Sequence, residues 1–207
     1  MKQRKGRIVW YILLGVDLVL FVLLGIQYVR HLKLQEGIAQ KVLRFHVVAN
    51  SDSREDQALK LAVRDAVGEQ MAVLLAGADS RDVCEELVRA HLNEIEQTAE
   101  AVLAENGCGY EVYASLEETD FPVKTYGSYT FPAGTYEALN VVIGEGAGHN
   151  WWCVMYPNMC FAGSVYEVVD EEAGEVLKQT LDEEEYRAIF SSGNYKVRFK
   201  YLSFLLD

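Results

Sequence analysis

Hydrophobic and polar residues alternate along residues 43–50 at the two-residue period of a β-strand. One side of this strand is apolar and the other is mixed: Leu43, Phe45, Val47 and Ala49 against Arg44, His46, Val48 and Asn50. A polar corner at residues 50–53 follows, and apolar positions then recur at three- and four-residue steps up to residue 75. Ser53, three residues before Asp56, resembles the start of a capping box. The pattern predicts a strand that turns directly into a helix ending near Gly77.

The remaining pattern predicts a second long helix, several strands and one short helix. The second helix begins at Asp79 or Ser80, ends at Asn106 and Gly107, and packs antiparallel to the first. Strands are expected at residues 110–116, 124–130, 136–143, 150–156 and 195–201, a loop at 117–122, and a short helix at 182–190. The nearly all-apolar strand 136–143 is expected in the centre of the sheet. Residues 150–156 return beside it as a hairpin across the glycine-rich turn 144–148.

These elements predict an α/β fold of the α+β kind, with a mixed or mainly antiparallel sheet and the two long helices packed on one face. An N-terminal transmembrane helix is expected to precede it. The apolar segment 8–29 has 22 residues, so as a helix it spans about 33 Å, enough for the hydrocarbon core of a bilayer. We expect residues 1–33 to form the basic end and anchor, 34–42 a stalk, and 43–207 the extracytoplasmic domain.

The basic residues at the N-terminus predict the orientation of this segment. Lys2, Arg4, Lys5 and Arg7 precede it, which favours a cytoplasmic amino end and an exported domain. A cleaved signal peptide and a buried core helix are the alternatives. The apolar run is longer than the roughly 7 to 15 residues of a signal peptide, and no A-x-A site follows it. An uncleaved anchor therefore fits this segment best.

Charge divides the chain at the same boundary. Residues up to 33 carry six Lys and Arg against one Asp, whereas residues 34–207 carry 13 Lys and Arg against 30 Asp and Glu. The exported part is therefore strongly acidic. A nucleic-acid partner is excluded in this view, because no basic stripe is available to neutralise phosphates.

Four cysteines, Cys84, Cys108, Cys153 and Cys160, raise the question of a disulfide. Outside the cytoplasm a disulfide is permitted, and Cys153 and Cys160 flank a loop that they can bridge. The alternative is that all four are small buried hydrophobic residues. The spacing of the cysteines does not decide between a disulfide and four buried thiols.

Two enzyme hypotheses use residues near the polar corner and the glycine-rich turn. His46, Asp52 and His149 are residue types that bind a catalytic metal with an open position, provided that the fold brings them together. Cys153 and His149, four residues apart, are candidates for a nucleophile and its base. Nothing in the spacing requires either arrangement.

The adjacent Trp151 and Trp152 point to opposite faces if they lie in a strand. Both are buried only if both faces of the sheet are covered. Otherwise one of them is exposed near Tyr156 and Phe161, a composition typical of a binding hot spot. Both possibilities stay open at this stage.

Two long stretches resemble the stage II sporulation protein R family of endospore-forming bacteria: FHVVANSDSREDQALKLAVRD and FPAGTYEALNVVIGEGAGHNWWCVMYPNMCF. The resemblance as a whole covers roughly residues 43–161. The resemblance implies a protein made in the forespore and exported to the space between the two septal membranes. There it would activate the membrane-embedded aspartic protease of the mother cell that processes the sigma-E precursor. The segment after Gly163 adds little to the resemblance.

In that role the protein is a ligand and allosteric activator, so the resemblance implies no catalytic residue, no cofactor, no metal and no small-molecule substrate. The expected partner-binding residues are those of the two matched motifs: Asn50, Ser51, Asp52, Asp56, His149, Asn150, Trp151 and Trp152. The alternative function is a metal-dependent septal or cell-wall hydrolase that uses His46, Asp52 and His149.

Overall fold

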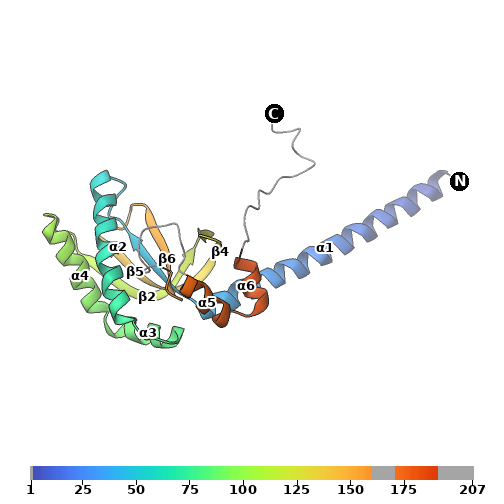
Figure 1. Ribbon diagram of the computed structural model, residues 1–207. Helices are drawn as coiled ribbons and strands as arrows, with labels where there is room; N and C mark the ends of the chain where they lie inside the picture. The colour runs from blue at the N-terminus through green and yellow to red at the C-terminus, as the bar shows by residue number, and fades with distance from the viewer. Residues whose placement is uncertain (1, 160–170, 191–207) are drawn as a thin grey trace.

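The computed structural model describes residues 2–159 and 171–190. Its centre is a four-stranded sheet with the strand order β2-β5-β1-β6 (Figure 1). The four strands are β1 (Leu43–Val48), β2 (Val112–Phe121), β5 (Gly134–Ile143) and β6 (Asn150–Tyr156). β1 runs parallel to β5, and the other two pairings are antiparallel. The predicted α+β fold with a mixed sheet is therefore confirmed.

Three helices cover one face of this sheet (Figure 1): α2 (Arg54–Leu74), α3 (Arg81–Ala90) and α4 (Leu92–Glu105). Ser53 caps α2 as expected, because its side chain accepts a hydrogen bond from the Asp56 N–H at 3.0 Å. The predicted second helix is interrupted at His91, whose N–H donates to Val88 O at 3.1 Å, only three residues back. The His91 ring also pairs with Leu87 O at 2.7 Å, so the local hydrogen bonding favours a turn.

The other face of the sheet is covered by smaller elements. These are the hairpin of β3 (Lys124–Tyr126) and β4 (Tyr129–Phe131), the helices α5 (Glu171–Thr180) and α6 (Glu183–Ile189), and the end of α1 (Lys2–Lys41). Helix α6 confirms the predicted short helix, whereas α5 had no predicted counterpart. Because both faces are covered, all six residues of β1 are buried.

Three sequence expectations are wrong. Strand β6 does not return beside β5, because β1 lies between them: Phe45 is opposite Leu139 of β5 and opposite Cys153 of β6. Residues 117–121, expected in a loop, continue β2 to Phe121 in pairing with β5. The expected edge strand 124–130 is instead a separate two-stranded hairpin. The expected strand 195–201 lies outside the described residues.

Helix α1 contains the apolar N-terminal segment. Its part Trp10–Lys41 contains an 18-residue window with a mean hydropathy of 2.3 and is long and apolar enough to cross a membrane by length and composition, as a signal sequence also is. Figure 1 shows its N-terminal part projecting from the domain. The last turns, where the sequence predicted a stalk, are helical and pack into the domain, with Ile38 and the following Val42 fully buried.

Candidate functional site

The polar corner and the glycine-rich turn form one surface, which we call the corner–loop surface and define as residues 50–53 and 144–149. Because β1 and β5 are parallel neighbours, their carboxyl ends meet at the same edge of the sheet. The backbone joins the two segments directly: Gly148 N–H donates to Ala49 O at 2.9 Å, and Ala147 N–H donates to Asn50 O at 3.1 Å. The two stretches that carry the family resemblance are thus in contact, although the bonded residues are nearly 100 positions apart in the sequence.

Asn50 and Asp56 organise the inner side of this surface. Asn50 Oδ1 accepts the Glu145 N–H at 2.9 Å, and its Nδ2 donates to Asp56 Oδ2 at 2.9 Å. The Ser51 hydroxyl donates to the same carboxylate oxygen at 2.5 Å. These bonds to Ser51 and then Asn50 lower the pKa of Asp56, because they stabilise its charged form. The carboxylate at the start of α2 thereby fixes the corner.

Asp52 and His149 form an exposed pair on the outer side. Asp52 Oδ1 accepts the His149 N–H at 2.6 Å and also contacts the ring nitrogen Nδ1 of His149. Hydrogen bonds from the His149 side chain and then its backbone lower the pKa of Asp52. The two side chains are 56% and 79% exposed, so both are accessible to a partner.

Lys60, which the sequence did not single out, supports the loop from below. It is only 6% exposed, and its Nζ donates to His149 O at 2.9 Å and to Gln57 Oε1 at 2.6 Å. Burial, and then repulsion from Arg64, lowers the pKa of Lys60. The sequence could have identified Lys60 as part of the site, because a residue four positions after Asp56 lies on the same face of the helix.

Gly148 makes the close contact between the two segments possible. A Cβ atom at this position would lie 2.2 Å from Ser51 O and 2.5 Å from Ser51 C, both backbone atoms. No side chain fits there without displacing the corner. Only glycine at position 148 of the second stretch therefore fits against the backbone of the first stretch at Ser51.

Trp151 and Trp152 lie at the start of β6, and both are half-buried. Trp151 packs edge-on against Phe45, with the ring centroids 5.3 Å apart. Trp152 stacks on His46 at 3.8 Å and contacts Phe121 at 4.6 Å. The possibility of one exposed tryptophan is therefore wrong, because helices cover one face of β6 and the β3–β4 hairpin covers the other.

The structure separates His46 from the other two members of the expected metal site. His46 is 7% exposed, and its Nδ1 pairs with Asn140 Oδ1 at 3.0 Å inside the sheet. Burial lowers the pKa of His46 against the opposing effect of hydrogen bonds to Asn140 and Asn150. Within residues 2–159 and 171–190, no group of three or more His, Cys, Asp or Glu residues could hold a metal ion. The geometry thus gives the hydrolase hypothesis no metal site.

The nucleophile hypothesis also fails. Cys153 is buried and disulfide-bonded, so it offers no thiolate, while His149 is turned toward Asp52 outside the strand. The expected disulfide partner of Cys153, Cys160, lies outside the described residues. The pairing of these two cysteines therefore stays a prediction. Cys84 and Cys108 are free thiols, and burial raises the pKa of Cys84 to about 11.

Comparison with known proteins gives the same family as the two stretches. The sequence model of the family described as stage II sporulation protein R matches residues 39–166, which include the whole corner–loop surface. A Bacillus subtilis (strain 168) relative named stage II sporulation protein R is 34% identical over 147 residues. The alignment covers 71% of this chain and 62% of the relative, so the chain spans less than two thirds of the relative's length. No solved structure matches the chain.

Proposed function

The chain belongs to the stage II sporulation protein R family, and on this premise we propose that it is a signalling protein exported from the forespore. Its proposed target is the membrane-embedded aspartic protease that processes the sigma-E precursor in the mother cell. The protein acts by binding and allosteric activation, and it contributes no catalytic residue, metal or cofactor. Its domain acts in the intermembrane space of the septum.

One observation carries this proposal: the two stretches that resemble the family meet in one exposed surface. Asp52 and His149 form an exposed polar pair on it, and Asn50, Ser51 and Asp56 hold the corner beneath them. We assign the direct partner contact to the exposed pair and to Asn150. The half-buried Trp151 and Trp152 then act mainly by fixing β6 in place.

The N-terminal helix and the charge of the domain support the proposed location. Helix α1 contains a stretch able to cross a membrane, and basic residues precede it, which favours export of the domain on its carboxyl side. The acidity of residues 34–207 keeps the domain soluble and disfavours tight binding to an anionic membrane surface. The corner–loop surface therefore stays free to meet a protein partner.

The test is processing of the sigma-E precursor in a non-sporulating host. The full chain, the protease and the precursor are co-expressed, and the cleaved precursor is quantified on immunoblots. We expect cleavage only when both the chain and the protease are present, and none when a catalytic aspartate of the protease is replaced. Cleavage with the inactive protease would mean that this chain is itself a protease, and cleavage without the chain would remove its role as activator.

A further inference from the structure

Helix α1 passes without a break from the apolar segment into the folded domain. It runs from Lys2 to Lys41, and the single residue Val42 connects it to β1, the central strand that leads to the corner. The helix contains no proline, the residue that most often kinks a helix. Between the apolar segment and the domain, the exposed stretch at residues 30–33 is helical as well.

The last turns of α1 belong to the hydrophobic core of the second face. Ile38 and Val42 are fully buried among residues of the sheet, the hairpin, α5 and α6, and Leu34 packs against the same cluster. Gly37 leaves room for the Glu185 side chain of α6, because a Cβ at this position would lie 2.3 Å from Glu185 Oε1. This part of α1 is therefore a structural element of the domain.

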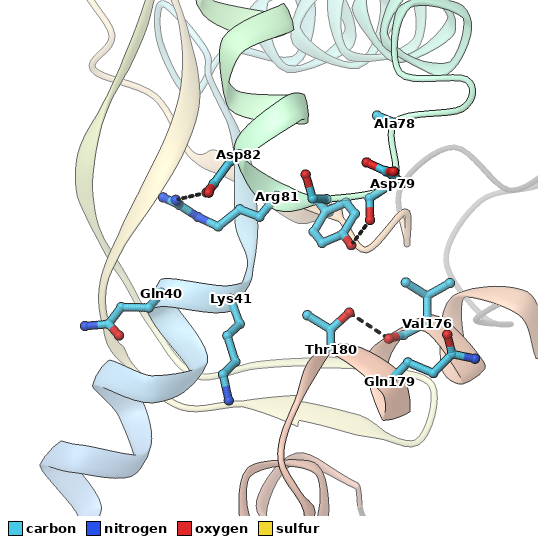
Figure 2. Close-up of a pocket in the computed structure, with 11 residues that line it drawn as sticks. Gln40, Lys41, Ala78, Asp79, Arg81, Asp82, Val176, Gln179 and Thr180 are labelled. Carbon is cyan, nitrogen blue, oxygen red and sulfur yellow. Dashed lines mark hydrogen bonds and ion pairs between the residues drawn. The ribbon is translucent and has the colours of Figure 1, made fainter.

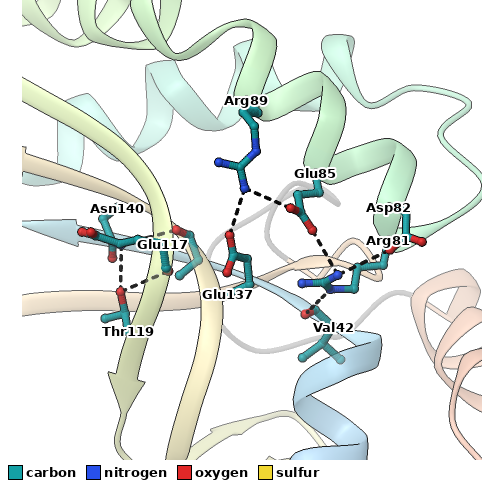
Figure 3. A network of polar contacts seen from close by, with 10 residues as sticks. Val42, Arg81, Asp82, Glu85, Arg89, Glu117, Thr119, Glu137 and Asn140 are labelled. Atoms are coloured by element: carbon teal, nitrogen blue, oxygen red, sulfur yellow. Dashed lines mark hydrogen bonds and ion pairs between the residues drawn. The ribbon is translucent and has the colours of Figure 1, made fainter.

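Polar contacts fix the same end of α1 from three sides. Gln35 Nε2 donates to Thr135 O of β5 at 3.2 Å, and Lys41 Nζ pairs with Glu185 Oε2 of α6 at 2.5 Å. Arg81 of α3 donates to Val42 O at 3.4 Å and is itself held by Glu85 at 3.0 Å (Figure 3). The contacts involve the sheet and helices on both of its faces, so they oppose rotation of the helix relative to the domain.

A pocket lies beside the junction between the end of α1 and the domain. Its volume is about 550 Å³, and it lies between the end of α1, the start of α3 and α5 (Figure 2). Gln40 and Lys41 contribute to its wall from α1, and Thr180 contributes from α5. Lys41 nevertheless keeps its ion pairs with Glu185 and Asp182, so the pocket leaves the polar contacts of α1 intact.

We propose that α1 is a rigid arm, which holds the corner–loop surface at one height and one tilt above the membrane so that a membrane-embedded partner meets it preorganised. The proposal rests on the proposed function for the identity of that partner. A stiff connection lowers the orientational entropy that is lost on binding. With a flexible tether, the contacts between the surface and its partner must offset the full entropy loss. The same stiffness restricts the surface to partners whose contact region lies at a matching height.

The experiment changes the stiffness of the exposed residues 30–33 and controls for the loss of their charges. One variant carries Gly-Ser-Gly-Ser at these four positions, and the matched control carries four alanines, which also remove the charges but keep the helix. Spin labels are placed on the full chain by Tyr28→Cys and Glu100→Cys, both exposed positions, in a background of Cys84→Ala and Cys108→Ala. The distance distribution in phospholipid vesicles and the processing activity are then measured.

We expect one narrow distance distribution for the native stretch and for the alanine control, and a broad one for the Gly-Ser variant. Processing should fall about fivefold or more in the Gly-Ser variant and stay near native in the control. A broad distribution with the native stretch would overturn the rigid arm, and so would full activity of the Gly-Ser variant. If the native chain activates nothing, the proposed function fails, whereas a narrow native distribution would still support the arm.

Discussion

The two faces of strand β1 are equally buried but differ in chemistry. Toward α2, α3 and α4 the strand presents Leu43, Phe45 and Val47, all fully buried in an apolar core. Toward the β3–β4 hairpin it presents Arg44, which is also fully buried, and His46, which is 7% exposed. The first face buries apolar area, whereas the second also buries polar groups, whose desolvation hydrogen bonds must offset. Among the described residues, Arg44 Nη1 and His46 Nε2 have no hydrogen-bond partner, so this offset is incomplete.

Aromatic rings, one backbone oxygen and a tyrosine hydroxyl surround Arg44 on the second face. Its guanidinium lies 4.2 Å from the ring centre of Phe121 and 4.9 Å from that of Tyr136. Its Nε donates to Cys153 O at 2.9 Å, and its Nη2 donates to the Tyr126 hydroxyl at 3.1 Å. Burial lowers the pKa of Arg44, a shift that the nearby tyrosines Tyr126 and Tyr136 oppose. The arginine thus links β1, β6 and the hairpin.

The largest expected effect is that of Arg44→Ala. The change leaves a cavity among the aromatic rings and removes the donor to Cys153 O, so we expect the free energy of unfolding to fall by about 3–5 kcal/mol. Urea unfolding followed by circular dichroism measures this. Arg44→Met, which keeps most of the volume, should cost clearly less. A loss below about 1 kcal/mol for Arg44→Ala would mean that the polar face contributes little to stability.

A smaller effect is expected for Phe45→Leu on the opposite face. Leucine keeps most of the buried apolar surface but loses the edge-on contact with Trp151, so we expect a loss of about 1–2 kcal/mol. The same urea experiment applies. If Phe45→Leu proves more damaging than Arg44→Ala, the apolar face is the more specifically packed of the two, and the comparison is reversed.

Between pH 7.5 and pH 5.5, the pH dependence of stability should come mainly from His46 on the second face. Because burial lowers the pKa of His46 in the folded protein, the unfolded chain binds the proton more readily. The contribution of His46 is therefore complete above its unfolded pKa of about 6.5 and is lost as the pH falls toward the folded value. We expect the urea midpoint to drop between pH 7.5 and pH 5.5, and to drop less in His46→Gln. An equal drop in both proteins would assign the pH dependence to other groups.

The sequence predicted those parts of the structure that depend on local patterns. The alternation of Leu43, Phe45 and Val47 identified the apolar face of β1, and Ser53 marked the start of α2. The two matched stretches also pointed to the corner and to the loop that contacts it. Each of these signals lies within a few residues of the feature that it predicts.

The errors concern contacts between distant segments. A hairpin of β5 and β6 was the simplest local solution, but β1, about 90 residues earlier in the chain, occupies the place beside β5. The burial of Arg44 depends on the β3–β4 hairpin folding across the sheet, and that of His46 depends on Trp152 of β6 and Phe121 of β2. No local pattern predicts these contacts. His46 could therefore be grouped with Asp52 in the sequence, although the structure places it inside the sheet.

Substitutions on the corner–loop surface, where both faces of β1 end, should have the smallest effect on stability. They should have the largest effect on signalling. Asp52→Asn combined with His149→Gln alters an exposed pair and should leave the urea midpoint unchanged. The matched control is Glu183→Gln combined with Arg187→Gln, which removes an exposed ion pair on α6.

Processing of the sigma-E precursor by these two double variants, each in the full chain, is the most direct test of the proposed signalling surface. We expect the Asp52/His149 variant to lower processing about tenfold or more, as expected when an accessible contact is lost, while the control processes like the native chain. Native processing by the Asp52/His149 variant, with native stability, would contradict the assignment of the corner–loop surface as the site that the partner recognises.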